Sequence, residues 1–372
     1  MASSLFPTSV YLDRLDRVRQ AMFDEEVDVL LLSVGPDLPW LTGYQAMPLE
    51  RLTMLVVPSQ GDATLVVPRM EAARVTEQPG VFGMRTWNET EDPVGIVAQL
   101  AGRSRITAIG DHTWSRFLVD LLWVMNKTIW RRGVTVTGPL RMAKDDAEID
   151  RLVVAAAAAD RVAAQLHDGE IALVGRTEAD VSADVSRRLI AEGHDKVNFA
   201  IVAAGENAAS PHHHAGDRVI RSGETVLLDF GGTMAGYCSD ITRCVSIGEP
   251  SAAVAEAYAV LHAAQAVGVA AGTVGTPCEE VDAVTRRVID DAGYGEFFIH
   301  RTGHGIGMEE HEDPYMVSGN KVPLRAGHAY SVEPGIYVTG EYGMRLEDIV
   351  VATDDGPMAL NHARHELVVL DG

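Results

Sequence analysis

The sequence predicts a chain of the α/β (α+β) class that is divided into two domains. Its 372 residues exceed one typical core, and 47% of them are hydrophobic, which suits a globular protein. In the first part, short apolar runs alternate with segments of helical periodicity, as in a small α/β domain. In the second part, two helical segments followed by strand-like runs occur twice, which is a weak sign of an internal repeat.

The first part contains predicted helices and strands in alternation. Apolar side chains at helical spacing predict a first helix, and a turn-rich segment at residues 59–62 predicts a β-hairpin. The expected helices cover residues 9–26, 71–78, 92–100 and 115–126, and the expected strands cover residues 28–34, 53–58, 63–68 and 106–110. No group of chemically useful side chains gathers in this part.

A boundary is expected near Gly138 and Pro139, which gives domains at residues 1–140 and 141–372. After it, acidic residues in the first turn favour a long alanine-rich helix. The expected helices of the second domain cover residues 145–167, 178–192, 251–272 and 278–292, and strands are expected at residues 197–204 and 225–230 and on to residue 245.

Charge and composition exclude several functional classes. A net charge of −22 argues against nucleic-acid binding and against anionic membrane surfaces. The longest apolar helix-like run, residues 152–159, is far shorter than a membrane span, and the N-terminus lacks a secretory pattern. Three cysteines without a C-x-x-C pair favour a reduced, cytoplasmic setting.

Two aspartates mark the chemically informative stretch. Asp229 ends a buried strand-like run, and Asp240 leads the next run after a glycine-bearing turn. A buried carboxylate is costly unless a cation or several hydrogen bonds compensate it. Two aspartates that face each other across a hairpin should repel, so this arrangement indicates metal ions between them.

Three further residues complete a ligand set. His304 lies between glycines that permit close backbone approach. Glu333 and Glu347 flank a second predicted hairpin with its turn at residues 339–343. Four carboxylates and one imidazole balance two divalent cations in charge.

The five ligands in this order resemble the dinuclear metallopeptidases of the methionine aminopeptidase, aminopeptidase P and prolidase superfamily. The resemblance covers residues 145–372 and implies the pita-bread catalytic fold. The segment Trp40-Leu41-Thr42-Gly43-Tyr44 is similar to a creatinase-like N-terminal domain. The strings closest to the proline-specific branch are Ala204-Gly205-Glu206-Asn207, Pro211-His212, Leu228-Asp229-Phe230-Gly231, Ser239-Asp240-Ile241-Thr242-Arg243, Gly303-His304-Gly305-Ile306-Gly307 and Val332-Glu333-Pro334-Gly335.

The resemblance implies two divalent ions per subunit, with Mn²⁺ favoured by four oxygen donors and one nitrogen, and Co²⁺ and Zn²⁺ left open. Asp240 and Glu347 would bridge the ions, Asp229 would bind one of them, and His304 and Glu333 would complete the other. Glu333 is also the expected proton shuttle.

The resemblance also assigns residues around the ligands. His212 matches a histidine beside the scissile bond, and His311 matches one that contacts substrate. His300 matches a further pocket histidine. Arg345 matches an arginine that supports the site by ion pairing, and it joins His300 and His311 as a substrate-binding candidate. Tyr337 is a further candidate for a supporting role.

The expected substrates are small peptides with proline at the second position, and a homodimer is expected from the resemblance alone. An Xaa-Pro dipeptidase is favoured, and aminopeptidase P is the alternative. The choice depends on whether a cation pairs with the free carboxylate of the dipeptide. Tyr315 stands where some microbial prolidases carry arginine, and Arg301 is another candidate for that cation. Two other functions are a creatinase-like amidinohydrolase and a non-catalytic pita-bread binding protein, but the intact ligand set disfavours both.

Overall fold

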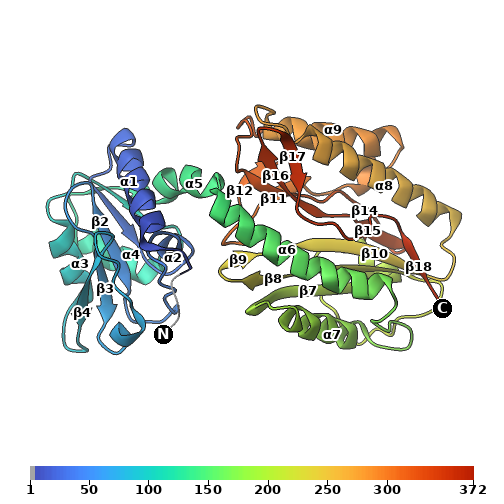
Figure 1. Cartoon of the computed structure of the whole chain (residues 1–372), viewed down its shortest axis with the longest axis horizontal. Helices are drawn as coiled ribbons and strands as arrows, with labels where there is room; N and C mark the ends of the chain where they lie inside the picture. The colour runs from blue at the N-terminus through green and yellow to red at the C-terminus, as the bar shows by residue number, and fades with distance from the viewer. Residues whose placement is uncertain (1–4) are drawn as a thin grey trace. The chain divides into compact units, whose positions relative to one another are not determined.

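The computed structural model describes residues 5–372, which form two compact units, one up to Arg141 and one from Met142 to Gly372 (Figure 1). The first unit contains a mixed six-stranded sheet in the order β4-β3-β2-β1-β5-β6. Its elements are α1 (Thr8–Asp24), β1 (Val29–Leu32), α2 (Asp37–Thr42), β2 (Met54–Pro58), β3 (Thr64–Pro68), η1 (Ala72–Arg74), β4 (Gly83–Trp87), α3 (Pro93–Ala101), β5 (Ile106–Ile109), α4 (Ser115–Val124), β6 (Ile129–Arg132) and α5 (Val134–Met142).

The predicted helices and strands of the first unit are mostly confirmed, but the helix over residues 71–78 is wrong. Only Ala72–Arg74 forms a short 3₁₀ turn. Gln78 precedes a proline, which disfavours helical backbone there. The carbonyl of Gln78 instead accepts from the backbone N–H groups of Val81 and Phe82, and this turn leads into β4. Gly138 and Pro139, expected at a boundary, lie inside α5.

The second unit has two sheets and a separate hairpin. The sheets run in the orders β18-β10-β8-β7, with β9 on β8, and β12-β11-β13-β16-β17, and the hairpin is β14-β15. Its elements are α6 (Asp146–His167), α7 (Glu178–Ala191), β7 (Lys196–Ala204), η2 (Gly205–Ala209), β8 (Thr225–Met234), β9 (Tyr237–Cys238), β10 (Ile241–Ile247), α8 (Ala252–Ala271), α9 (Cys278–Asp291), η3 (Gly295–Phe297), β11 (Gly303–Gly305), β12 (Glu312–Met316), β13 (Ala329–Val332), β14 (Gly335–Val338), β15 (Tyr342–Arg345), β16 (Asp348–Thr353), β17 (Gly356–Ala359) and β18 (Val368–Leu370).

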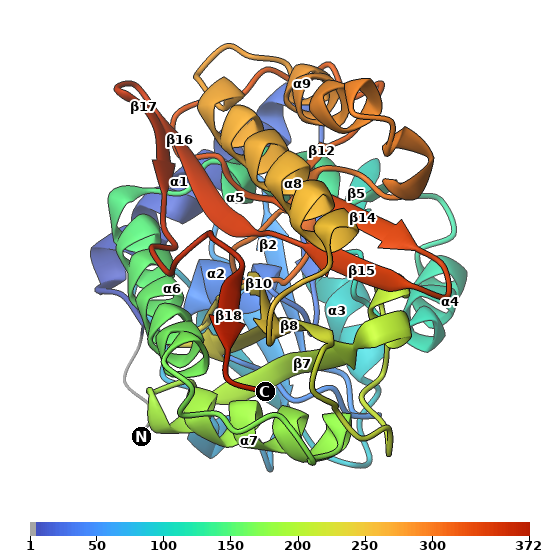
Figure 2. The same cartoon turned by 90° about the vertical axis from the view of Figure 1, so that its right-hand side faces the viewer.

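Each sheet of the second unit is covered by one helix pair. In Figure 2, α6 and α7 lie with β7, β8 and β10, whereas α8 lies with β13 and β17 and α9 lies with β12. The alanine-rich helix α6 begins with a capping box between Asp145 and Glu148 and buries a face of small side chains. Two helices followed by a sheet therefore occur twice, as the sequence pattern indicated.

Helix α8 is long and apolar enough to cross a membrane by length and composition. The prediction that residues 152–159 form the longest apolar helical run is therefore wrong, because α8 is longer. Leu261 and Ala264 of this helix are fully buried in a cluster with Ile289 of α9 and Ile336 of β14. A core helix meets the same two criteria, so the finding is weak evidence for a membrane span.

Candidate metal centre

Asp229 and Asp240 come from one hairpin and lie on the same face of it. Asp229 of β8 is paired directly with Thr242 of β10. Asp240 stands two residues before Thr242, and side chains two residues apart in a strand share a face. Both aspartates are buried, with 8% and 4% of their surface exposed. The hairpin reverses at Ala235 and Gly236, which both adopt positive φ.

Glu333 and Glu347 flank the second hairpin. Strands β14 and β15 pair from Gly335 with Arg345 to Val338 with Tyr342, so each glutamate stands two residues beyond the last pair. Their backbones therefore leave the hairpin side by side, as its predicted spacing required.

The two hairpins meet at a single β-bridge between Thr242 and Glu347. The hydroxyl of Thr242 donates to Glu347 Oε2 over 2.6 Å. The same hydroxyl accepts from Arg345 Nε over 3.1 Å. One threonine thus ties a carboxylate of the second hairpin to the strand that follows Asp240.

His304 completes the group from β11. Its Nε2 lies 3.2 Å from Glu333 Oε1 and 3.8 Å from Asp240 Oδ2. Its Nδ1 lies 3.1 Å from the carbonyl oxygen of Gly305. A carbonyl only accepts, so Nδ1 carries the proton and Nε2 presents a lone pair to the carboxylates, as in metal-bound histidines. A Cβ at Gly303 would stand 1.8 Å from the carbonyl oxygen of Ser331, so this close approach of β11 to β13 requires glycine.

The donor set fits a divalent metal. Single donor atoms of Asp240, His304 and Glu347 all lie within 4.8 Å of one another. One oxygen each of Asp229, Asp240 and Glu347 is buried without a hydrogen-bond partner among the described residues. Such buried oxygens are costly unless something compensates them, and hard cations prefer oxygen ligands together with imidazole. Glu333 adjoins the group through His304.

The pKa values of the proposed ligands are shifted because several ionisable groups are buried close together. Burial raises the pKa of Asp240, and the carboxylates of Glu347 and Asp229 raise it further. Burial and the nearby Glu333 likewise raise the pKa of Glu347. Burial raises the pKa of Glu333 to about 7, and burial lowers the pKa of His304 to about 3. Negative charge is therefore disfavoured here unless a cation is present.

Arg345 supplies positive charge inside the group and is 3% exposed. Its Nη2 donates to Asp229 Oδ2, its Nη1 donates to Tyr337 Oη over 2.7 Å, and its Nε lies 3.9 Å from Glu333 Oε2. Arg345 therefore holds the carboxylates in place, which is the supporting role that the resemblance implies.

A second guanidinium fixes the backbone behind the ligands. Arg243 is fully buried and donates to the carbonyls of Glu347 over 2.6 Å and Thr242 over 2.9 Å. It also forms an ion pair of 2.7 Å with Asp348 Oδ1. The role of Arg243 depends on contacts with the segment from Glu347 to Arg364, which lies more than 100 residues further along the chain.

The outer histidines occupy different positions. The ring of His311 lies 3.9 Å from that of His304, centre to centre. His212 is exposed, and its charge helps to lower the pKa of both His300 and His311, after burial and nearby arginines.

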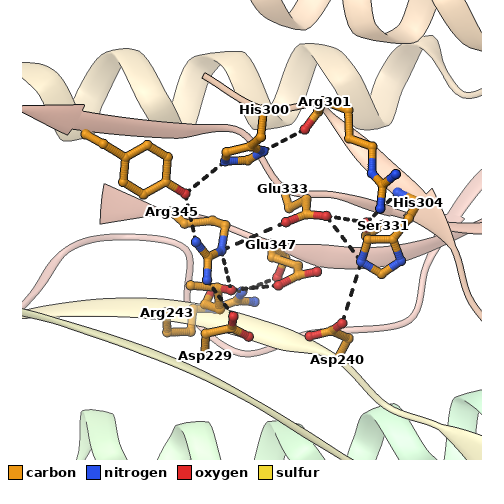
Figure 3. A network of polar contacts seen from close by, with 12 residues as sticks. Asp229, Asp240, Arg243, His300, Arg301, His304, Ser331, Glu333, Arg345 and Glu347 are labelled. Atoms are coloured by element: carbon orange, nitrogen blue, oxygen red, sulfur yellow. Dashed lines mark hydrogen bonds and ion pairs between the residues drawn. The ribbon is translucent and has the colours of Figure 1, made fainter. Parts of the chain in front are cut away.

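Both ring nitrogens of His300 have partners. Tyr337 Oη accepts from Arg345 and so donates to His300 Nε2 over 2.9 Å. His300 Nδ1 lies 2.7 Å from the carbonyl of Arg301. Burial lowers the pKa of His300 to about 4, so the ring is neutral in this chain of hydrogen bonds. Tyr337 therefore links Arg345 to His300, and these two residues are labelled in Figure 3.

Comparisons with known proteins agree with this architecture. The model of metallopeptidase family M24 matches residues 150–354, and the creatinase/prolidase N-terminal domain matches residues 14–119. The chain is 42% identical to the probable dipeptidase PepE of Mycobacterium tuberculosis over 381 residues, which cover all of this chain and 99% of that protein.

Solved structures give the same result. The dipeptidase PepE of Mycobacterium ulcerans matches with a TM-score of 0.93 and 42% identity, covering 99% of this chain and all of that one. The prolidase of Thermococcus sibiricus matches with a TM-score of 0.91 and 34% identity, covering 97% of this chain and 99% of that one.

The chain belongs to metallopeptidase family M24. The expected fold class, a creatinase-like N-terminal domain followed by a pita-bread catalytic domain, is confirmed, as is the assignment to the metallopeptidases. Membership of this family implies the use of divalent metal.

Replacing Glu333 with glutamine should change the pH dependence of stability in the metal-free protein. The folded state raises the pKa of Glu333 from 4.5 to about 7, so between these values it holds a proton that the unfolded state has lost. The stability contributed by this group is fully present below about pH 4.5 and is lost as the pH rises through about 7, a change of about 3 kcal/mol.

Urea unfolding of metal-free wild type and Glu333→Gln between about pH 4 and 8 measures this difference. The contribution of His304, whose pKa is lowered, runs in the opposite direction and is present in both proteins. A stability difference between the two proteins that stays constant with pH would contradict the assignment.

Proposed function

We propose that this protein is a metal-dependent Xaa-Pro dipeptidase. The observation that carries the proposal is the position of Arg301 beside the carboxylate and histidine group. The Arg301 guanidinium lies 4.2 Å from the centre of the Tyr315 ring. Its charge lowers the pKa of His304, His311 and Glu333, after the larger effect of burial in the histidines, so its field reaches the centre. Arg301 forms no ion pair within residues 5–372.

A guanidinium that is positioned but has no carboxylate partner suits the C-terminal carboxylate of a dipeptide. Arginine binds carboxylates with two parallel charge-assisted hydrogen bonds. Tyr315 orients that arginine through its ring face and can add one hydrogen bond from its hydroxyl. Tyrosine at this position therefore does not remove the carboxylate site, because Arg301 takes over the positive charge. The names of the relatives, dipeptidase and prolidase, support the same reading.

The metal ligands in this proposal are Asp229, Asp240, His304, Glu333 and Glu347, which would hold two divalent ions, with Mn²⁺ favoured over Co²⁺ and Zn²⁺. Such ions, when bound, activate water and polarise a peptide carbonyl. The division of the chain follows the sequence: residues 1–140 form the N-terminal domain, and residues 141–372 form the catalytic domain. We place the enzyme in the cytoplasm.

The side chains act in defined steps. Arg301 binds the proline carboxylate and orients the scissile bond. His212 and His311 hydrogen-bond the carbonyl oxygen as charge develops on it. Glu333 takes a proton from the attacking water on a carboxylate oxygen and delivers it to the imino nitrogen of proline. The carbonyl carbon gains the hydroxyl, and the C–N bond breaks. His300 and Arg345 keep these groups in place through Tyr337 and Asp229.

Asp240→Ala and Glu333→Ala should abolish hydrolysis of Ala-Pro and leave a cooperatively folded protein. Even residues that only support a metal ligand cost 10- to 100-fold, so the loss here should exceed about 100-fold. Turnover with added Mn²⁺, metal content after gentle purification and urea unfolding measure the effect. Glu256→Ala, which removes an exposed carboxylate on α8, is the control. Near wild-type turnover in either ligand variant would contradict the proposed site for two metal ions.

The preference for dipeptides is tested by comparing kcat/KM for Ala-Pro, its C-terminal amide and Ala-Pro-Ala. The amide and the tripeptide should lose most of the rate, because they leave Arg301 without its carboxylate. Arg301→Gln should lower the rate on Ala-Pro by about 10- to 100-fold and change the rate on the amide little. Tyr315→Phe keeps the ring and should lose less.

Arg187→Gln, which removes an exposed guanidinium on α7, is the matched control. If the tripeptide is cut as fast as the dipeptide, aminopeptidase P is the better assignment. If none of the three peptides is cut with Mn²⁺, Co²⁺ or Zn²⁺, the proline specificity itself is wrong.

The proposed enzyme is a homodimer, an expectation that depends on family resemblance. Light scattering at micromolar concentration should give about twice the chain mass of 40.0 kDa. A monomeric mass would refute the homodimer and leave the proposed chemistry unchanged.

A further inference from the structure

A buried carboxylate outside the ligand set holds the loop that carries His212. Glu178 is the first residue of α7 and is fully buried. The loop runs from η2 to Gly216 and donates hydrogen bonds to the Glu178 carboxylate. A buried carboxylate is stable only where donors surround it.

The donors to Glu178 come from both sides of His212. Before it, the backbone N–H of Ala204 donates to Oε1 over 2.9 Å, and Asn207 Nδ2 lies 3.0 Å from Oε1 and 3.1 Å from Oε2. After it, His213 Nε2 lies 2.8 Å from Oε2, and the N–H of Gly216 lies 3.5 Å from the same oxygen. A carboxylate only accepts, so His213 carries its proton on Nε2. One side chain thus closes the loop at its start and its end.

The backbone of α7 adds to this attachment. The N–H of Glu178 donates to the carbonyl of Arg218 over 3.0 Å, and the N–H of Ala179 donates to the carbonyl of Gly216 over 3.0 Å. These N–H groups have no partner within the helix, because they lie in its first turn. The helix N-terminus also favours a negative side chain there. The loop is therefore bound to the start of α7 by main chain and side chain together.

A close contact holds the other side of the loop. A Cβ at Gly343 of β15 would stand 1.8 Å from the carbonyl oxygen of Ala208. The η2 turn therefore packs directly on the backbone of β15, the strand that ends at Arg345. The loop lies between α7 and a strand that leads to the ligand Glu347.

Adjacent histidines in this loop face different surroundings. The side chain of His213 is 19% exposed and is engaged by Glu178. His212 is exposed, and its charge reaches His300 and His311. Fixing His213 inward therefore fixes the direction in which His212 leaves the backbone.

We propose that Glu178 and His213 are positioning residues that aim His212 at the substrate. The inference rests on the proposed function, because it gives His212 a substrate contact. Neither residue touches the ligand set, so their effect on catalysis passes through the loop. Misplacing a reacting group by about 1 Å can cost up to about 100-fold in rate.

A double-mutant cycle tests this coupling. Glu178→Gln should lower kcat/KM for Ala-Pro by about 10- to 100-fold in the wild type. In a His212→Gln background the same change should cost less than about 2-fold, because the group it positions is gone. Asp184→Asn, a carboxylate on the same helix that pairs with Arg176 and does not contact the loop, should leave both backgrounds unchanged. Equal losses in both backgrounds would reduce Glu178 to a purely structural role and overturn the proposal.

Two measurements keep the test independent of turnover. Mn²⁺ affinity by titration calorimetry should be the same in wild type and Glu178→Gln, and a large loss would place the effect in the metal site instead. The NMR signal of the His212 ring, assigned by its absence in His212→Gln, should shift or broaden in Glu178→Gln and stay unchanged in Asp184→Asn. An unchanged signal would overturn the proposal even if the protein cut no Xaa-Pro peptide.

A conservative variant covers the case in which Glu178→Gln does not fold. His213→Gln keeps a side-chain N–H donor near Glu178, whereas His213→Ala removes it. Glutamine should retain most of the activity and of the His212 signal, and alanine should lose both. If glutamine and alanine lose both equally, the hydrogen bond to Glu178 does not set the position of His212.

Discussion

The structure of the second unit depends on the compensation of buried negative charge. Four carboxylates converge where the β8-β10 hairpin meets the β14-β15 hairpin, and three of them leave an oxygen without a partner among the described residues. Arg345 offsets part of this charge, and Thr242 satisfies one further oxygen. A divalent cation would compensate the remaining buried charge, and the donor atoms of Asp240, His304 and Glu347 fit such an ion. Stability and function are therefore linked at one place.

Much of this site could be predicted because its residues stand in short, local patterns. Asp229 and Asp240 flank one tight hairpin, and Glu333 and Glu347 flank another, so the spacing along the chain already places each pair side by side. His304 stands in the glycine-rich strand β11. Gly303 is needed there because β11 approaches β13 too closely for a side chain. The order of these strings then pointed to the family.

The parts that sequence reasoning missed depend on contacts between distant segments. Thr242 and Glu347 are 105 positions apart, and nothing local to either indicates their hydrogen bond. The role of Glu178 was also hidden, because its donors lie in a loop that the chain reaches only after β7. In the first unit, the edge strands β4 and β6 went unnoticed because their side chains are partly exposed and lack a clear apolar alternation.

The pairing of β10 has a consequence for how the chain can be synthesised. Strand β10 carries Thr242 and Arg243, pairs with β8 on one side and lies parallel to β18 on the other. Arg243 also donates to the carbonyls of Ala363 and Arg364. During translation β10 emerges long before these partners, so the nascent chain exposes an open strand edge and an unpaired guanidinium for most of the synthesis of this unit. The segment that leads into β18 therefore completes the partners of β10 and Arg243 late in the synthesis of this unit.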